Sequence, residues 1–311
     1  MRIYHGIKEF ERIKYPVVTS GTFDGVHVGH QKILKRVSQM ARSKGGETVL
    51  LTFWPHPKFV LNPGNPMKLL TTFQEKSDHL RTLGVDHLIR IPFTKEFSQI
   101  TSEEFVKTIL VERIGTRQLV IGYNHRFGKN REGSFKYLQE NASKFGFEVV
   151  EISRKDVDHI AVSSTKIREH ILNNQIHLAN KLLGRPYEFS GKVVRGQQIG
   201  RKIGFPTANI EIGEQYKLLP SDGTYAVQVH VRGTRKHGMM NIGVKPTLGK
   251  QPRSIEVHIF NFEYEIYGAE LKVEVIKQIR PEMKFKNLEE LSNRLLLDSQ
   301  EARTILTKDI N

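Results

Sequence analysis

Cysteine is absent from this chain of 311 residues. Without it the protein has no disulfides, no thiolate metal ligands and no thiol nucleophile. The sequence also lacks any apolar run near the roughly 20 residues that a membrane helix needs. Its first residues lack the continuous apolar segment of a secretory signal. These absences predict a cytoplasmic protein that does not span a membrane.

Acidic residues are too few to balance the basic ones: 33 Asp and Glu oppose 48 Lys and Arg, which leaves a formal net charge of +15. A basic protein attracts polyanions such as nucleic acid, anionic membranes or nucleotide phosphates. The basic residues are dispersed, without an arginine-rich tail, zinc-finger spacing or aromatic RNA-binding signature. A dispersed excess is commonly a solubilising surface charge. The charge therefore indicates anionic ligands without choosing among them, and we expect no nucleic-acid partner.

Short β-branched runs alternate with helical patterns in the first half of the chain. The runs expected to be strands are 17–20, 48–53, 86–91, 118–122 and 147–152. Local signals mark helix ends between them, such as the capping box Thr72-Phe-Gln-Glu75 and the pair Gly45-Gly46. Strands alternating with helices predict a Rossmann-like parallel α/β domain with right-handed crossovers.

One glycine-rich turn, Gly21-Thr-Phe-Asp-Gly-Val-His-Val-Gly-His30, lies between the first of these strands and a helical pattern. Such a turn places a phosphate group against backbone N–H groups and the positive end of a helix. No further metal ligands follow His27 and His30 at suitable spacing. We therefore expect these histidines to stabilise charge that builds on a phosphate, not to bind a metal or act as essential bases.

Other segments should converge on this turn, because ligands of parallel sheets bind beyond the carboxyl ends of the strands. Those segments are 54–57 and 122–133. A further run, Ser163-Ser-Thr-Lys-Ile-Arg168, opens another helical pattern. Hydroxyl residues at a helix start are either plain N-caps or, with Arg168 one turn later, a polyphosphate site. Both interpretations stay open at this point.

The pattern changes near Gly184-Arg-Pro-Tyr187, so we place a domain boundary between residues 1–184 and 185–311. Period-two alternation after it indicates an antiparallel sheet or barrel, and we predict a β-barrel. We expect residues 287–308 to form a long closing helix. The apolar stripe expected on that helix is Leu288, Leu291, Leu295, Ala302 and Ile305.

Glycines are dense between Gly191 and Gly204, just ahead of Phe205-Pro-Thr-Ala-Asn209. This run is either two β-turns before an ordinary strand or a phosphate-wrapping loop with Arg201 as a cation. Thr207 and Asn209 are two positions apart, so on a strand they share a face. Neutral oxygen ligands on one face suit Mg²⁺, which also binds phosphate.

Glu256 and His258 also share one face of a predicted strand, opposite three apolar residues. By itself this pattern favours a solvated polar face. A kinase acting on an alcohol would gain from a carboxylate there, since free alcohols are poor nucleophiles.

Taken in order, these motifs resemble the bacterial bifunctional FAD synthetase family. In the first half the matching segments are 21–30 with its His-x-Gly-His signature, 52–57, 122–128 with Arg131 and Gly133, and 163–168. In the second half they are 191–209, 223–225, 241–243, 246–247, 256–258, 267–268 and 279–282 with Phe285. The resemblance spans nearly the whole chain. A different nucleotidyltransferase could share the first turn, but it would have no reason to carry the second domain.

The resemblance implies that the C-terminal domain phosphorylates riboflavin to FMN with ATP and Mg²⁺. The N-terminal domain would then transfer AMP from a second ATP to FMN, giving FAD and pyrophosphate. In that reaction His27 and His30 engage the ATP phosphates, and the segment 163–168 holds the triphosphate. The full set predicted for adenylyl transfer also contains Gly21, Phe23, Asp24, Gly29, Asn124, Arg126, Ser163, Ser164, Thr165 and Arg168.

For the kinase, the resemblance implies that Glu256 deprotonates the ribityl 5′-hydroxyl and that Thr207 and Asn209 hold Mg²⁺. The remaining ATP and flavin residues predicted there are Gly191, Gly196, Arg201, Gly204, Pro206 and Arg280, the last on a mobile flap. The chain departs from the family pattern at His125, where an aromatic residue is usual. Smaller departures are Asn261, Glu265 and Ile266.

Overall fold

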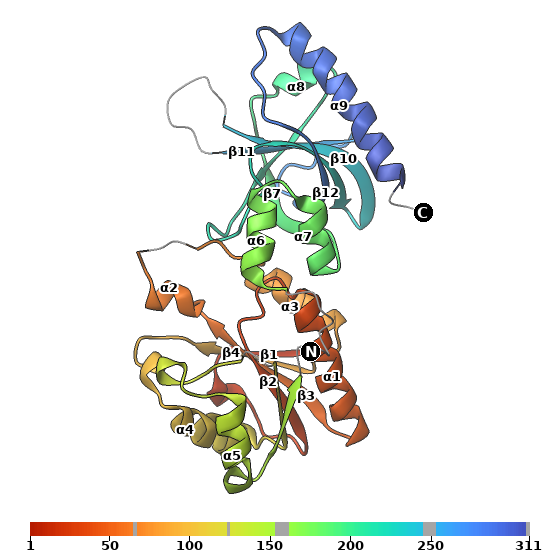
Figure 1. Ribbon diagram of the computed structural model, residues 1–311. Helices are drawn as coiled ribbons and strands as arrows, with labels where there is room; N and C mark the ends of the chain where they lie inside the picture. The colour runs from red at the N-terminus through yellow and green to blue at the C-terminus, as the bar shows by residue number, and fades with distance from the viewer. Residues whose placement is uncertain (65–66, 123–124, 153–161, 245–252, 309–311) are drawn as a thin grey trace. The chain divides into compact units, whose positions relative to one another are not determined.

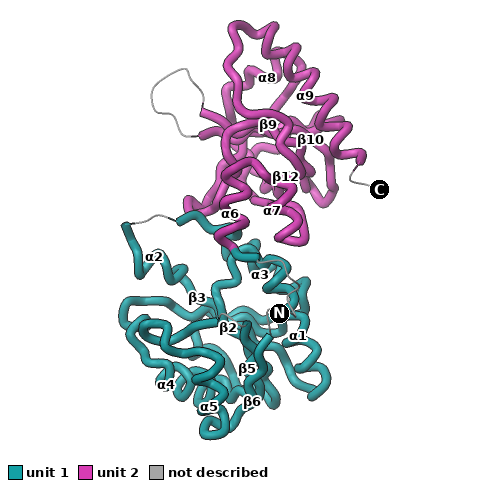
Figure 2. Tube along the Cα trace, in the orientation of Figure 1, with its two compact units in different colours: residues 1–163 teal, residues 164–311 magenta. Residues whose placement is uncertain are grey.

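The chain forms two compact units, residues 1–163 and 164–311, in a computed structural model (Figure 2). The structure describes residues 1–64, 67–122, 125–152, 162–244 and 253–308. None of the helices in these ranges is both long enough and apolar enough to cross a membrane.

Helices α6 (Ser164–Leu172) and α7 (Ile176–Leu183) belong to the second unit, although the predicted boundary follows them. Asn180 of α7 explains this packing, because its Nδ2 donates to the Val275 carbonyl at 2.9 Å and its Oδ1 accepts from the Tyr187 N–H at 2.7 Å. The division by packing therefore falls earlier than 184/185, which stays a prediction about where the two activities divide.

The first unit contains a six-stranded parallel sheet in the order β1-β4-β3-β2-β5-β6, which confirms the predicted α/β class (Figure 1). Its strands are β1 (Arg2–Tyr4), β2 (Pro16–Ser20), β3 (Glu47–Trp54), β4 (His87–Pro92), β5 (Gln118–Gly122) and β6 (Glu148–Ile152). The strand order reverses beside β2, because β3 and β5 pair on its two sides. A reversal of this kind opens a crevice at the carboxyl ends of the strands, where the turn 21–30 begins.

Helices cover both faces of this sheet (Figure 1). Helices α1 (Val28–Ser43) and α3 (Phe73–Thr82) pack on one face through Leu34 and Leu80. The other face is covered by a continuous helix that begins as α4 (Ser102–Glu104) and continues as the π-helix η3 (Phe105–Ile114), with α5 (Phe135–Phe145) beside it. The shorter helices are η1 (Ile7–Glu9), α2 (Pro57–Leu61), η2 (Phe97–Gln99) and η4 (Lys129–Arg131).

The second unit is a closed antiparallel barrel in the order β10-β11-β8-β7-β12-β9, as predicted. Its strands are β7 (Tyr187–Val194), β8 (Ala208–Glu211), β9 (Gly223–Val231), β10 (Thr234–Gly243), β11 (Ser254–Ile259) and β12 (Glu270–Pro281). The short helix α8 (Ile199–Lys202) lies between β7 and β8.

Helix α9 (Leu288–Lys308) packs along β9 and β10 (Figure 2). Its predicted apolar stripe is right at Ala302, which is fully buried, and at Leu295 and Ile305, which pack on the same cluster. It is wrong at Leu288, which is 54% exposed. The buried residues of this helix, Asp298, Ala302 and Leu306, all lie in its second half, so its first turn is the more exposed part.

Candidate active sites in the two units

The turn 21–30 connects β2 to α1 in an unusual backbone conformation. Phe23 and Val26 have positive φ values of 48° and 40°, which are uncommon for residues other than glycine. The buried Asp24 carboxylate holds the turn in this shape, because it accepts hydrogen bonds from the backbone N–H groups of Leu70 (2.9 Å) and Thr71 (3.2 Å). Asp24, predicted as a site residue, is therefore seen here in a structural role.

The two histidines of this turn stack on each other, with ring centroids 3.7 Å apart and an interplanar angle of 14°. His27 caps α1, because its Nδ1 accepts the His30 backbone N–H at 3.4 Å. A neutral His27 therefore carries its proton on Nε2. A side chain at Gly29 would come within 3.0 Å of Val162 and 3.3 Å of the His27 ring, so glycine lets the helix begin against them.

His30 is neutral at physiological pH. Burial, then the neighbouring His27, then Lys76 hold its pKa well below the usual value. Its Nδ1 is buried and has no hydrogen-bond partner among the described residues. A neutral imidazole with an uncommitted nitrogen can donate or accept a hydrogen bond, and an arriving anion would favour its protonation.

A second segment meets this turn at the carboxyl edge of the sheet, as expected. His125 Nε2 lies 3.2 Å from the Ser20 hydroxyl at the end of β2, which joins the loop after β5 to the turn. Burial, and secondarily Arg131, lower the pKa of His125 to about 4, so it is a neutral ring stacked on Phe127 at 5.9 Å. The neighbouring Arg126 is exposed. Asn124 lies outside the described residues.

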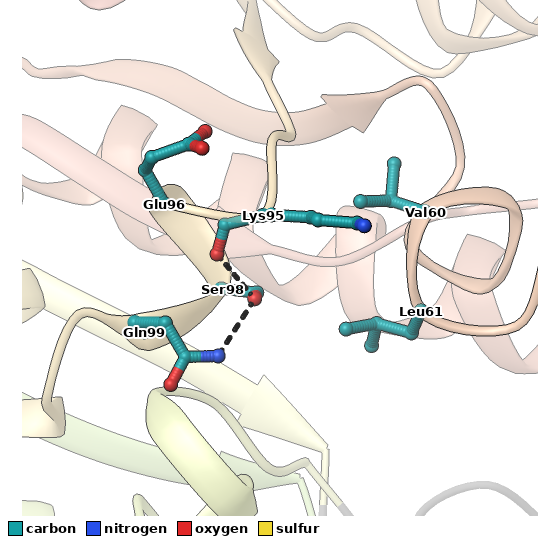
Figure 3. Close-up of a pocket in the computed structure, with 6 residues that line it drawn as sticks. All are labelled: Val60, Leu61, Lys95, Glu96, Ser98 and Gln99. Carbon is teal, nitrogen blue, oxygen red and sulfur yellow. Dashed lines mark hydrogen bonds between the residues drawn. The ribbon is translucent and has the colours of Figure 1, made fainter.

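A pocket of about 380 Å³ follows the carboxyl ends of β3 and β4 (Figure 3). Its apolar side comes from α2 and its polar side from the residues in and before η2. The lining residues are Val60, Leu61, Lys95, Glu96, Ser98 and Gln99. Ser98 donates to the Lys95 carbonyl at 2.6 Å and accepts from Gln99 at 3.2 Å, while the Lys95 side chain reaches towards Val60. This polar wall is therefore fixed by its own hydrogen bonds.

The hydroxyl-rich segment 163–168 is divided between the two units. Ser163 ends the first unit, and Ser164, Thr165 and Arg168 lie on the first two turns of α6 in the second. Ser163 and Thr165 are exposed, whereas Ile167 is fully buried and anchors the helix. Exposed hydroxyl groups suit either a helix cap or a phosphate site, so triphosphate binding by this segment stays a prediction.

A row of polar side chains crosses the barrel of the second unit. Cross-strand register pairs Asn209 with Glu256 and Glu256 with Asn241. Asn241 pairs in turn with Thr224, and Thr224 with Arg280. The strand β11 alternates between half-buried and buried positions, with Glu256 among the half-buried ones, as predicted. The row therefore lies on the outer face of the barrel, and Thr224 and Asn241 are members that sequence patterns did not single out as site residues.

The glycine-rich loop after β7 folds onto one end of this row. A Cβ placed on Gly196 would lie only 2.2 Å from the Asn209 Nδ2 atom, so the loop backbone rests directly on that side chain. Beside it, the Thr207 hydroxyl donates to Glu256 Oε2 at 3.2 Å. The structure thus brings together Gly196, Thr207, Asn209 and Glu256, four residues predicted to share a site.

Other predicted kinase residues surround this group at different distances from it. The Pro206 carbonyl lies 2.8 Å from Nδ1 of His258, whose pKa is lowered by burial. Gly191 lies on β7, and Gly204 takes a φ of 81° in the turn before Pro206. Arg201 is exposed on α8, with its guanidinium 3.7 Å from Glu265.

Arg280 lies on β12 in a buried ion pair, which differs from the flap position that the resemblance implies. Its Nε and Nη2 donate to the carboxylate of Asp298 on α9 at 2.9 and 2.8 Å, and Asp298 is fully buried. Arg294 also donates to Asp298 at 2.8 Å. Asp298 occupies a core position between Leu295 and Ala302, and a charged residue at such spacing is the signal that could have identified it.

Glu282 follows this strand at an exposed position, and its carboxyl group senses the charge of Glu256. Burial raises the pKa of Glu282, while its hydrogen bond with Asn241 and the charge of Arg280 oppose that rise. A second carboxyl group therefore belongs to the surroundings of the polar row.

Two family models match the chain one after the other. The model described as FAD synthetase covers residues 10–166, and the model described as riboflavin kinase covers residues 183–306. A bifunctional riboflavin kinase/FMN adenylyltransferase from Buchnera aphidicola subsp. Schizaphis graminum is 38% identical over 303 residues, which is 96% of each chain. Another, from Listeria monocytogenes serovar 1/2a, is 40% identical over 94% of this chain and 93% of its own.

Among solved structures, a Streptococcus pneumoniae protein described as a macrolide-efflux protein matches with a TM-score of 0.87 and 29% identity. It covers 97% of this chain and 98% of its own. The ordered family matches and the relatives that match it along nearly its full length place this chain in the family of bifunctional riboflavin kinase/FMN adenylyltransferases.

Proposed function

We propose that the polar row of the barrel is the riboflavin kinase site and that the turn 21–30 is the adenylyl-transfer site. The observation that carries the first assignment is the cluster of Thr207, Asn209 and Glu256 under the loop at Gly196. Membership in this family gives the overall sequence of reactions, in which riboflavin is converted to FMN and FMN to FAD. Both reactions use only flavin, ATP and Mg²⁺, so we propose no nucleic-acid partner.

In the kinase reaction the ribityl 5′-hydroxyl attacks the γ-phosphorus of ATP. The new P–O bond forms as the bond to ADP breaks, and the hydroxyl proton passes to a base. We assign that base to Glu256, because its carboxylate lies on the half-buried outer side of β11 and one of its oxygens accepts a hydrogen bond from the Thr207 hydroxyl.

Thr207 and Asn209 are proposed to hold Mg²⁺. The hydroxyl and amide oxygens of this pair suit a hard cation that keeps several waters and binds phosphate. Glu256, opposite Asn209 in the strand register, adds negative charge nearby. When bound, Mg²⁺ neutralises phosphate charge, and the loop at Gly196 is placed to wrap the same phosphates.

In the adenylyl transfer a phosphate oxygen of FMN attacks the α-phosphorus of ATP and pyrophosphate leaves. A phosphate monoester has a second pKa near 6 and is largely dianionic at neutral pH, so this step needs no general base. His27 and His30 act as hydrogen-bond donors at the positive end of α1, where they stabilise charge on the phosphate oxygens. The His30 ring is neutral in the free protein, and its buried Nδ1 atom has no hydrogen-bond partner among the described residues, so it is suited to meet a phosphate oxygen.

The pocket between α2 and η2 is proposed to take part of the flavin. Its volume falls in the range of small-molecule sites. Val60 and Leu61 offer an apolar surface, whereas Ser98 and Gln99 offer donors and acceptors. A ring system with one apolar and one polar edge fits that division.

Replacing Glu256 by Gln tests the assignment of two separate sites. We expect E256Q to abolish FMN formation from riboflavin, while the conversion of supplied FMN to FAD continues at the wild-type rate. Glu263→Gln, at an exposed position, is the matched control and should affect neither reaction. Products are separated by chromatography. If E256Q lost both activities while remaining folded, the two-site assignment would be wrong.

A further inference from the structure

Lys76 is a buried cation beneath the adenylyl-transfer turn. It lies on α3 at the core positions shared by Phe73, Ser77 and Leu80, and it is only 7% exposed. Its ammonium group donates to the Thr22 carbonyl at 3.2 Å and to the Thr52 hydroxyl at 3.0 Å. A buried ammonium needs such acceptors to offset the loss of water. The contacts therefore fix both the lysine and the start of the turn.

The contact with Thr22 also sets the orientation of the next peptide N–H. A trans peptide is planar, so the Thr22 carbonyl and the Phe23 N–H point in opposite directions. The Thr52 hydroxyl lies 3.4 Å from the same carbonyl and reinforces this orientation. Phe23 has a φ of 48°, a conformation that persists only when its surroundings hold it in place. Lys76 is one of the groups that hold it.

Several charges face the Lys76 ammonium. Asp24 in the turn favours the charged form, whereas Arg90 on β4 opposes it. Burial is the largest influence, and together these effects lower the pKa of Lys76 to about 8. His30 on α1 is coupled to the same charge, since Lys76 contributes to its low pKa. The Phe73 ring lies 5.7 Å from the Lys76 ammonium and 4.7 Å from the Arg90 guanidinium, which packs the two cations around one aromatic ring.

We propose that Lys76 is a positioning residue for adenylyl transfer, and that its protonated form holds the turn in the geometry that binds the ATP phosphates. The proposal rests on the assignment of that reaction to the turn 21–30. Loss of the proton removes the charge-assisted hydrogen bond to Thr22 and one positive charge near the phosphates. Adenylyl transfer should therefore decline as the pH rises through the pKa of Lys76, whereas riboflavin phosphorylation in the other unit should not follow that titration.

The test compares kcat/KM for FMN adenylylation from about pH 6.5 to about pH 9.5, because this parameter reports the ionisations of the free enzyme. The wild type should lose activity with a midpoint near pH 8, the pKa of Lys76. K76M should lower kcat about 10²-fold, the usual cost of a misplaced reacting geometry, and should lack the alkaline decline. K76R should restore most of the activity and move the decline beyond this range. R81M, which removes an exposed cation from the same helix, should match the wild type.

Riboflavin phosphorylation by the same samples and their thermal unfolding report whether each variant is folded. A purely structural lysine would lower stability and leave the pH profile unchanged. The proposal is overturned if K76M keeps kcat within about threefold, or if its alkaline decline persists unchanged. If K76M does not fold, K76R serves as the test: an alkaline decline of adenylyl transfer at the same pH as in the wild type would also overturn the proposal. A wild type that makes no FAD from FMN and ATP would instead refute the proposed function.

Discussion

Adding one methyl group at Gly196 should disable the kinase while sparing the adenylyltransferase. The Cβ of alanine at this position would lie 2.2, 2.4 and 2.6 Å from three side-chain atoms of Asn209, whereas an ordinary contact begins at 3.4 Å. The loop and the amide must therefore separate by about 1.2 Å. Since φ at Gly196 is not in the positive range that favours glycine, the effect comes from this contact and not from backbone strain.

The expected loss of kinase activity follows from the two groups that would be displaced, the Asn209 side chain and the loop at Gly196. Asn209 is proposed to hold Mg²⁺, and the loop is proposed to wrap the ATP phosphates. A shift of about 1 Å in a reacting geometry costs about 10²-fold in rate. We therefore expect G196A to lower kcat/KM for riboflavin phosphorylation by about two orders of magnitude, with a higher Mg²⁺ concentration needed for half-maximal activity.

The assay measures FMN formed from riboflavin, and FAD formed from supplied FMN, with the same enzyme sample. The second rate should stay at the wild-type value and confirms that the protein is folded. Gly213→Ala is the matched control, because a Cβ there meets no atom within 4 Å. Kinase activity of G196A within about threefold of the wild type would refute the claim that the loop rests on a functional Asn209.

Two further perturbations test the charged groups. D298A should lower the free energy of unfolding of the second unit by about 3–5 kcal/mol, because it leaves the buried Arg280 without its ion-pair partner. Denaturant unfolding measures this free energy, and a decrease below about 1 kcal/mol would contradict the ion-pair argument. The pKa of His30 should rise when a non-hydrolysable ATP analogue binds, because the phosphate charge favours the imidazolium. NMR titration of the ring measures this pKa, and an unchanged value would mean that ATP binds elsewhere. In the free protein the pKa of His30 is lower in the folded state than in the unfolded chain, so the unfolded chain takes up a proton at His30 first as the pH falls. The free energy of unfolding should therefore decrease as the pH falls below about 6.5, the usual pKa of histidine.

Local signals predicted the elements of both units with good accuracy. The capping box at Thr72 is formed as expected, and a second one is formed at Thr101, because each depends on residues three positions apart. The turn at Arg232-Gly233 has positive φ at both residues, which suits a tight hairpin. Strand β1 was missed because three residues are too few to show a period.

Features that depend on long-range packing were harder to predict. The stripe of α9 failed at Leu288, because which turns of a helix are buried depends on where the barrel ends. Lys76 and Asp298 were missed although both occupy core positions of their helices. The partner of such a charged residue cannot be recognised from the sequence, because only the fold brings Thr22 to Lys76 and Arg280 to Asp298.

The sequence alone determined which side chains are available and in which order the elements follow, since strand period, helix caps and glycine turns are local properties. Only the tertiary structure decided which of these side chains meet. Strand register assembled the polar row from residues as distant along the chain as Asn209 and Arg280. Burial decided the protonation of His30 and Lys76, because a pKa depends on neighbours and solvent that the linear sequence does not contain.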